Sequence, residues 1–336
     1  MKGVAVALGD IGGRKAAALI RDGRIDDFLI DGDAPAPGTV FRGICDRPMK
    51  GAGGLFLRLA DGQRGYLRQA KGLKPGQAVL VQVTAHAEPG KAMPVTPKVI
   101  FKSRYAIVTP GAPGLNLSRR IREEDQRERL KEVAQSADLP EDFGLIIRSQ
   151  AADAESEEIA ADIAAVAKAA AEVMADEGTN PDCLLDAPDA HARAWIDWPR
   201  PDAPPAGFAE LGVDELLDGM RGTQVALGGA TAHIEPTRAL VAVDVNTGAD
   251  TSPAAGLKAN IALARDLPRQ LRCRGLGGQL TLDLAPMARK DRRQFETVLK
   301  AAFRADPVET VLAGWTPLGH FELQRKRERL PVADLI

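Results

Sequence analysis

Two apolar segments in the C-terminal third of the chain share one pattern. Residues 238–248 read RALVAVDVNTG, and residues 277–287 read GGQLTLDLAPM. Each is a run of apolar side chains with an aspartate near its end, Asp244 in the first and Asp283 in the second. A continuous apolar run of this length predicts a strand that is covered on both faces of its sheet.

The two aspartates need a physical explanation in such strands, because an unpaired carboxylate loses its hydration when it is buried. Two carboxylates at matching strand ends suggest a shared divalent cation with oxygen ligands, such as Mg²⁺. Asn246 follows Asp244 by two positions, so both side chains face the same way on a strand. The alternative is that each aspartate is an ordinary turn or cap residue.

The pattern of apolar runs and turn residues divides the chain into five segments. A β-rich opening precedes a segment of five short strands, which is typical of an OB-fold barrel. A third segment mixes strands with two helices, and a Pro-rich connection leads to a last segment of alternating strands and helices. The expected class is α/β, in several domains. The segments are residues 1–37, 38–100, 101–180, 181–236 and 237–330.

The barrel segment carries two aromatic candidates for contacts with nucleic-acid bases. Its strands are expected at residues 40–45, 54–59, 65–67, 78–83 and 95–100. Phe56 and Tyr66 fall where such barrels expose aromatic rings, and a base stacked on such a ring contributes about 1–3 kcal/mol. The alternative is that both are core residues, because half the positions of any strand face inward.

The third segment contains a buried strand, FGLIIRS, that ends in Arg148 and Ser149. A guanidinium fork followed by a hydroxyl suits a terminal phosphate group. The alternative is an ordinary ion pair between Arg148 and a surface acid such as Asp153. A following helix over residues 152–177 has apolar residues at spacings of three and four, which predicts one buried face.

The last segment predicts one helix over about residues 254–274 and another over residues 288–304. Pro268 lies inside the first, so a kink or break is expected there. The net charge of −2 excludes a general electrostatic attraction to nucleic acid, so nucleic-acid binding would depend on local basic residues. Five arginines are the candidates for backbone phosphates: Arg289, Arg292, Arg293, Arg325 and Arg327.

Composition excludes several other classes. The three cysteines form no CxxC pair, and the four scattered histidines form no pair with ligand spacing, so neither a disulfide framework nor a zinc site is expected. No stretch has the length and apolarity of a signal peptide or a membrane span. A cytoplasmic protein with no membrane partner is therefore the default expectation.

The region from Arg238 to Arg329 carries a resemblance in four parts, RALVAVDVNTG, Asn260, RQLRCRGLGGQLTLDL and LGHFELQRKR. Taken together, these parts resemble the catalytic region of the ribonuclease E/G family. The resemblance implies an OB-fold barrel inserted before a DNase I-like catalytic domain. It also implies an RNase H-like part, reduced here, that pairs with the N-terminal strands. Arg148 and Ser149 correspond to a pocket that senses an RNA 5′-monophosphate, with serine in place of the family's threonine.

This resemblance implies a Mg²⁺-dependent endoribonuclease that cuts single-stranded RNA in RNA processing or decay. Asp244 and Asp283 would hold Mg²⁺, and Asn246 would orient the attacking water or contact the scissile phosphate. The competing interpretation is a non-catalytic RNA-binding protein with a vestigial nuclease site. A phosphatase of small molecules is a third interpretation, which the barrel and the basic residues fit poorly.

The sequence departs from the family pattern at three points. The family has no proline at the position of Pro268, and residues 181–236 are shorter than the corresponding region. The Cys-Pro-x-Cys zinc-link is absent, and the chain stops soon after Leu330. We therefore expect no zinc-linked tetramer, and a monomer or a weaker homodimer instead.

Overall fold

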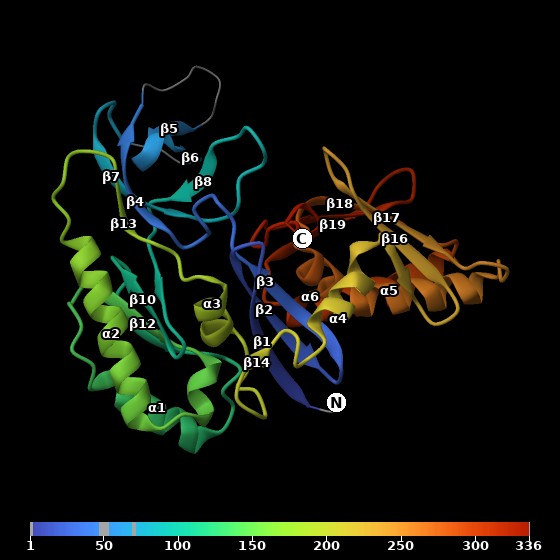
Figure 1. The fold of residues 1–336 in the computed structure, drawn as a ribbon, viewed down its shortest axis with the longest axis horizontal. Coiled ribbons are helices and arrows are strands. Elements are labelled where there is room, and N and C mark those ends of the chain that lie inside the picture. The colour runs from blue at the N-terminus through green and yellow to red at the C-terminus, as the bar shows by residue number, and fades with distance from the viewer. Residues whose placement is uncertain (1–2, 47–53, 69–71, 336) are drawn as a thin grey trace. The chain divides into compact units, whose positions relative to one another are not determined.

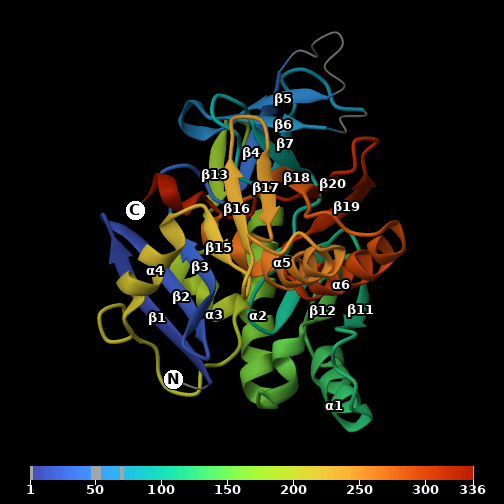
Figure 2. The same ribbon diagram turned by 90° about the vertical axis from the view of Figure 1, so that its right-hand side faces the viewer.

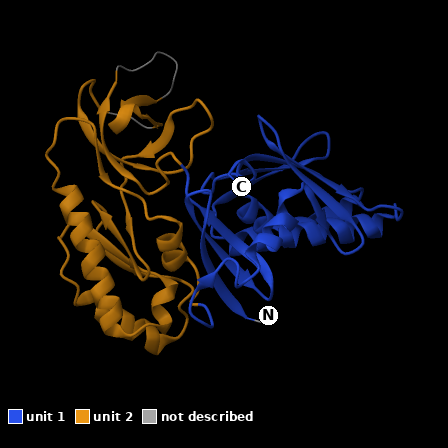
Figure 3. Ribbon diagram, viewed as in Figure 1, with its two compact units in different colours: residues 1–32, 201–336 blue, residues 33–200 orange. Residues whose placement is uncertain are grey.

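The computed structural model describes residues 3–46, 54–68 and 72–335. The chain forms two compact units, residues 1–32 with 201–336 and residues 33–200 (Figure 3). The division at residue 200 splits the segment 181–236 that the sequence predicted as one connecting region. Among the described residues, no helix combines the length and apolarity needed to cross a membrane.

The first part of the unit 33–200 is a closed five-stranded β-barrel (Figure 1). The strands follow the order β4-β5-β6-β8-β7, and pairing of β7 with β4 closes the barrel. Strands β6 and β8 are parallel, and β13 adds to the outer side of β4. The arrangement is consistent with the predicted OB-fold. The strands are β4 (Val40–Cys45), β5 (Leu55–Arg58), β6 (Arg64–Leu67), β7 (Ala78–Val83), β8 (Met93–Thr96) and β13 (Asp182–Leu185).

The rest of this unit is a four-stranded sheet in the order β11-β12-β10-β9, packed against helices. The helix α2 (Ser156–Met174) buries Ile159, Ile163 and Val166 against the sheet, which confirms the apolar face predicted from their spacing. The other elements are β9 (Phe101–Lys102), β10 (Ala106–Pro110), β11 (Gly114–Leu117), β12 (Phe143–Ile147), α1 (Glu124–Gln135) and α3 (Ala190–Asp197).

The N-terminal residues form a small sheet in the other unit, in the order β14-β1-β2-β3. Strand β14 comes from the Pro-rich connection and pairs in parallel with β1. Phe28 and Phe208 pack with Val213 of α4 in one apolar cluster. The elements are β1 (Val4–Ile11), β2 (Arg14–Arg21), β3 (Arg24–Ile30), β14 (Ala206–Gly207) and α4 (Val213–Arg221).

The C-terminal residues form a six-stranded sheet in the order β15-β16-β17-β18-β20-β19. Helices α5 and α6 lie side by side against one face of it (Figures 1 and 2). Strands β17 and β18 are parallel, and the other pairs are antiparallel. The elements are β15 (Gln224–Ala226), β16 (Thr231–Pro236), β17 (Val241–Asn246), β18 (Gly278–Asp283), β19 (Thr310–Trp315), β20 (Phe321–Arg325), α5 (Pro253–Arg274) and α6 (Arg292–Ala305).

The prediction that β17 and β18 are covered on both faces is wrong. Along β17, Val241, Val243 and Val245 are buried, whereas Asp244 and Asn246 between and after them are exposed. Strand β18 alternates in the same way, since Leu280 and Leu282 are buried and Asp283 is exposed. The helices therefore cover one face only, and the polar side chains lie on the other.

Helix α5 runs without a break from Pro253 to Arg274, although Pro268 lies inside it. Ser252 caps its first turn by accepting a hydrogen bond from the Ala255 N–H, and Gly275 ends it with a φ of 67°. Leu263 and Leu267 are fully buried on the side that faces the sheet. The predicted break is therefore wrong. Pro268 lacks a backbone N–H and removes one helical hydrogen bond, but buried residues before and after it in the chain pack in the core and hold the helix.

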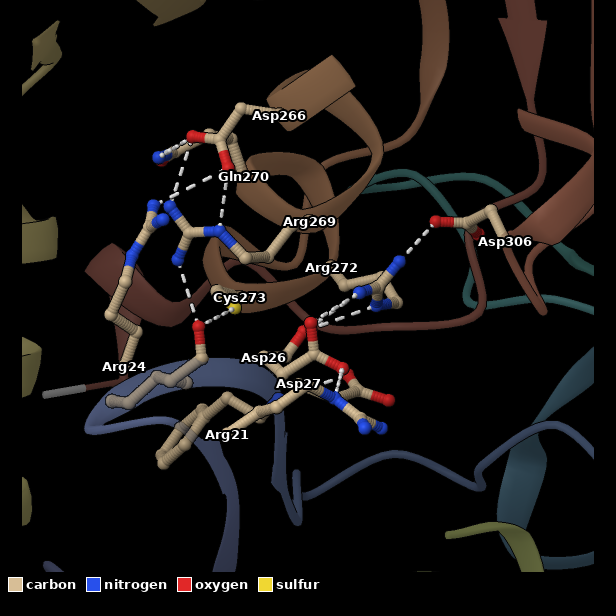
Figure 4. Close-up of polar contacts among 12 residues, drawn as sticks. Arg21, Arg24, Asp26, Asp27, Asp266, Arg269, Gln270, Arg272, Cys273 and Asp306 are labelled. Atoms are coloured by element: carbon tan, nitrogen blue, oxygen red, sulfur yellow. Dashed lines mark hydrogen bonds and ion pairs between the residues drawn. The ribbon is translucent and has the colours of Figure 1, made fainter. Parts of the chain in front are cut away.

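A buried polar network joins α5 to the N-terminal sheet within this unit (Figure 4). The Arg272 guanidinium donates to the Asp26 carbonyl at 2.8 Å and to the Asp306 carboxylate. One turn earlier, Arg269 donates to the Ile25 carbonyl at 2.8 Å and to Asp266 at 2.7 Å. These bonds to strand β3 explain why residues 1–32 belong with residues 201–336.

Candidate active site

The predicted acidic residues meet at the centre of the C-terminal sheet. Asp244 of β17 is directly opposite Asp283 of β18 in the parallel register. Because neighbouring strands lie about 4.8 Å apart, both carboxylates leave the sheet side by side at the C-terminal strand ends. They lie on the face that α5 and α6 leave uncovered, and the Asp283 side chain is 67% exposed.

Solvated carboxylates need no compensation for burial, so desolvation does not indicate a cation here. The pairing of the two carboxylates on adjacent strands is what favours a shared metal ion. Asn246 lies on the same face, and its Oδ1 accepts a hydrogen bond from the Gly248 N–H at 2.8 Å. This turn contact is made by Asn246, whereas the alternative placed a turn or cap at Asp244 and Asp283 themselves.

Two histidines extend the acidic pair into a row across four strands. The antiparallel register places His233 of β16 opposite Asp244. On the other side, pairing of Leu282 with Phe321 brings His320 next to Asp283, and its Nδ1 lies 3.3 Å from Asp283 Oδ1. Sequence reasoning missed both histidines because only the strand register brings them to the aspartates.

The donor set fits one kind of metal better than others. Within the described ranges, no three histidine, cysteine, aspartate or glutamate side chains are grouped to hold an ion. A zinc site of three or four protein ligands is therefore not formed by these residues. Two carboxylates beside open solvent are the set with which Mg²⁺ binds while keeping several waters.

Asn260 fixes the chain immediately after Asp283. It is fully buried on α5. Its Nδ2 donates to the Ala285 carbonyl at 2.9 Å, and its Oδ1 accepts from the Ala285 N–H at 3.0 Å. The sequence indicated Asn260 only as part of a resemblance, and the structure shows that it ties the helix to the segment that follows the acidic strand end.

The basic residues separate into surface and structural groups. Arg289, in the turn before α6, and Arg293, in its first turn, are exposed. The Arg292 guanidinium lies 4.2 Å from the Trp315 ring centroid. Arg327 is half-buried near the start of β18. These four remain near the sheet as candidates for phosphate contacts.

Arg325 does not fit the predicted RNA contact. It is 2% exposed, and its guanidinium donates to Asp306 at 3.2 Å and to Thr310 Oγ1 at 2.9 Å. Strand β20 alternates, so Arg325 shares the helix-facing side with Phe321 and Leu323. The prediction is wrong because the strand turns this arginine into the core.

Phe56 and Tyr66 lie on the outer side of the barrel. They are opposite each other on β5 and β6, and their ring centroids are 5.2 Å apart. Both are half-buried, whereas the flanking residues Leu55, Leu57 and Leu67 fill the barrel core. The alternative of two core aromatics is therefore not observed.

Arg148 and Ser149 follow β12 as predicted, but the guanidinium already has protein acceptors. It donates to the carbonyls of Ser103 and Ile196, the latter at 2.9 Å, and to the Asp197 carboxylate at 3.0 Å. Burial lowers the pKa of Arg148. The alternative partner predicted for it, Asp153, is replaced by Asp197, which also lies 2.5 Å from the Lys102 ammonium.

Comparison with known proteins gives a consistent set of relatives. A model of the ribonuclease E/G family matches residues 101–204 and 201–328. Ribonuclease E of a Nostoc species is 25% identical over 381 residues, which cover 95% of this chain and 55% of that protein. Ribonuclease G of Escherichia coli is 30% identical over 316 residues, which cover 79% of this chain and 62% of that protein. The chain thus spans between about half and two-thirds of the length of these relatives.

Proposed function

Because this chain belongs to the ribonuclease E/G family, we propose that it is a Mg²⁺-dependent endoribonuclease. It hydrolyses phosphodiester bonds in single-stranded RNA, in RNA processing or decay. The observation that carries the proposal is the register of Asp244 opposite Asp283 on the uncovered face of the sheet. Within the family, this sheet corresponds to the DNase I-like domain, the barrel to the OB-fold, and the N-terminal sheet to the RNase H-like part.

Asp244 and Asp283 are the proposed ligands of Mg²⁺. Two carboxylates leave most positions of an octahedral ion open to water and substrate phosphate. When bound, the ion supplies Lewis-acid polarisation of the phosphoryl oxygen and a water of lowered pKa. Asn246 lies on the same face two residues after Asp244, where its amide can contact the scissile phosphate or orient the attacking water.

RNA binding is assigned to two surfaces. On the barrel, Phe56 and Tyr66 offer rings on which bases stack, and Arg64 lies 4.9 Å from the Phe56 ring centroid. On the C-terminal sheet and α6, four arginines bind backbone phosphates, which position the RNA without reading its sequence. They are Arg289, Arg292, Arg293 and Arg327.

We also assign 5′-monophosphate sensing to Arg148 and Ser149. A phosphate at this place replaces Asp197, which is the anion that now lies between Arg148 and Lys102. The exchange of one anion for another keeps both cations paired. The wild type should prefer 5′-monophosphorylated over 5′-hydroxyl RNA. Ser149→Ala should lose this preference and still cleave both RNAs.

The decisive experiment incubates a 5′-monophosphorylated single-stranded RNA with Mg²⁺ and either the wild type or Asp283→Asn. Internal cleavage should require Mg²⁺ and disappear in the variant, while RNA binding remains. The matched control is Gln279→Ala, an exposed residue on the same strand, which should cleave like the wild type. RNA binding without cleavage in every protein would instead support a binding protein with a vestigial nuclease site.

A further inference from the structure

His320 has a polar atom beside the acidic pair that no described protein group satisfies. Its Nδ1 is buried and has no hydrogen-bond partner in the part of the chain that the structure describes. The nearest anion is Asp283 Oδ1 at 3.3 Å, a distance that allows a hydrogen bond once the carboxylate turns toward the ring. Buried polar atoms in native proteins nearly always have a partner, so this geometry calls for an explanation.

The backbone holds His320 in place at the end of the β19–β20 hairpin. The Thr316 hydroxyl accepts from the His320 N–H at 3.1 Å, and the Thr316 N–H donates to the His320 carbonyl at 2.8 Å. A tight turn precedes it, in which the Gly319 N–H donates to the Thr316 carbonyl at 3.0 Å. Gly319 has a φ of 93°, a conformation that a side chain rarely adopts.

Asp283, by contrast, has little else to hold it. Its side chain is 67% exposed at a strand end, and among the described residues His320 is its ion-pairing neighbour. On the other side of the row, His233 Nδ1 lies 3.5 Å from the Thr223 hydroxyl, so that ring is engaged away from the aspartates. The two histidines therefore differ in their relation to the acidic pair.

We propose that His320 is a positioning residue for the Asp283 carboxylate. The Nδ1–H donates to Oδ1, which fixes the rotation of the carboxylate and leaves Oδ2 directed at the divalent cation. This inference rests on the proposed function, because it assigns a role toward the same cation. His320 acts through Asp283, since the atom that faces the carboxylate is shielded from solvent.

The energetic reason is preorganisation. An exposed carboxylate samples several rotamers, and a ligand that is already held in the binding orientation loses less freedom when the cation arrives. Partners that orient metal ligands in this way typically change metal affinity or activity by about 10- to 100-fold when they are removed. His320 is expected to fall in this range.

The test measures Mn²⁺ binding by electron paramagnetic resonance, without RNA and without turnover. His320→Ala should bind Mn²⁺ about 10- to 100-fold more weakly than the wild type. His320→Asn should restore most of the affinity, because its amide N–H can take the place of Nδ1–H, whereas His320→Gln should not. Gln279→Ala is the matched control on β18, the strand that carries Asp283, and should bind like the wild type.

RNA cleavage at varied Mg²⁺ supplies the second readout. His320→Ala should need more Mg²⁺ for half-maximal cleavage while its kcat at saturating Mg²⁺ approaches that of the wild type. Equal Mn²⁺ affinity in the wild type, His320→Ala and His320→Gln overturns this role and leaves the nuclease intact. A wild type that neither binds Mn²⁺ nor cleaves RNA overturns the proposed function and this role with it. If His320→Ala fails to fold, the difference between His320→Asn and His320→Gln decides.

Discussion

The guanidinium of Arg325 lies 3.2 Å from the carboxylate of Asp306, and the two side chains are 1% and 0% exposed. Asp306 also pairs with Arg272 of α5, so one buried carboxylate joins the last strand of the sheet to the helix beneath it. Burial lowers the pKa of Arg325. This pair is a structural element of the C-terminal sheet rather than a part of the proposed RNA surface.

Asp306→Asn should lower the free energy of unfolding by about 3–5 kcal/mol, because it leaves buried guanidinium groups without their carboxylate. Urea unfolding followed by circular dichroism measures the change. Arg293→Ala, at an exposed position of α6, is the control and should change stability by less than about 0.5 kcal/mol. A small loss in Asp306→Asn would mean that the pair is not buried in solution.

Much of the strand pattern was visible in the sequence, because apolar runs set off by Gly and Pro identify strands without any tertiary information. Strands β4 and β7 have the predicted bounds. The prediction of two covered faces for β17 is wrong, although Val243 alternates with Asp244, and Val245 with Asn246, as on a strand with one covered face. Ala242, a small residue on the open face, made the run look continuously apolar.

The partners of charged residues were not predictable from local pattern. Arg325 finds Asp306 at a separation of 19 residues, and Arg148 finds Asp197 at a separation of 49. The row of His233, Asp244, Asp283 and His320 likewise depends on the register of four strands. A sequence shows which residues can carry charge, whereas the pairing that decides burial depends on the sheet.

Phe56→Ala should weaken binding of single-stranded RNA by about 1–3 kcal/mol if one base stacks on the ring. The loss of stability should be small, because Phe56 lies outside the barrel core and its contact with the Tyr66 ring contributes about 0.5–1.5 kcal/mol. Fluorescence anisotropy with a labelled oligonucleotide measures the affinity.

The comparison for Phe56 is Leu57→Ala on the same strand. Leu57 is fully buried in the barrel, so its truncation should cost about 2–5 kcal/mol of stability and affect RNA binding only through unfolding. Equal RNA affinity in Phe56→Ala and the wild type would mean that RNA does not contact the outer face of β5 and β6.

Asn260→Ala should both destabilise the protein and reduce cleavage. It leaves the buried N–H and carbonyl of Ala285 without partners, and each unsatisfied group costs about 1–3 kcal/mol. Because Ala285 follows Asp283 by two residues, the strand end that carries the carboxylate also loses its anchor. Urea unfolding and cleavage at saturating Mg²⁺ are the measurements. Asn116→Ala, an exposed asparagine of β11, should leave both unchanged.

The free energy of unfolding should fall with rising pH in the alkaline range because of Cys273. Its thiol is buried next to the polar network of α5, and burial raises its pKa from 9.0 to about 12. Between pH 9.0 and about 12, the unfolded chain loses the thiol proton and the folded chain keeps it, so the folded state binds more protons and stability declines as pH rises. The contribution of this group approaches about 1.4 kcal/mol per pH unit, and it is absent below that range, where both states hold the proton.

Urea unfolding from about pH 8 to 11 gives the slope of the unfolding free energy against pH for the wild type and for Cys273→Ala, and one titrating proton contributes about 1.4 kcal/mol per pH unit. The variant should be less stable below pH 9.0 because a buried group is removed, and above pH 9.0 its slope should be shallower by the Cys273 contribution. Cys183→Ala is a comparison rather than an unchanged control: its half-buried thiol has a pKa raised from 9.0 to about 11, so this variant should lose its own slope in that range and keep the contribution of Cys273. Parallel curves for the wild type and Cys273→Ala would show that the Cys273 thiol ionises alike in the folded and unfolded chains.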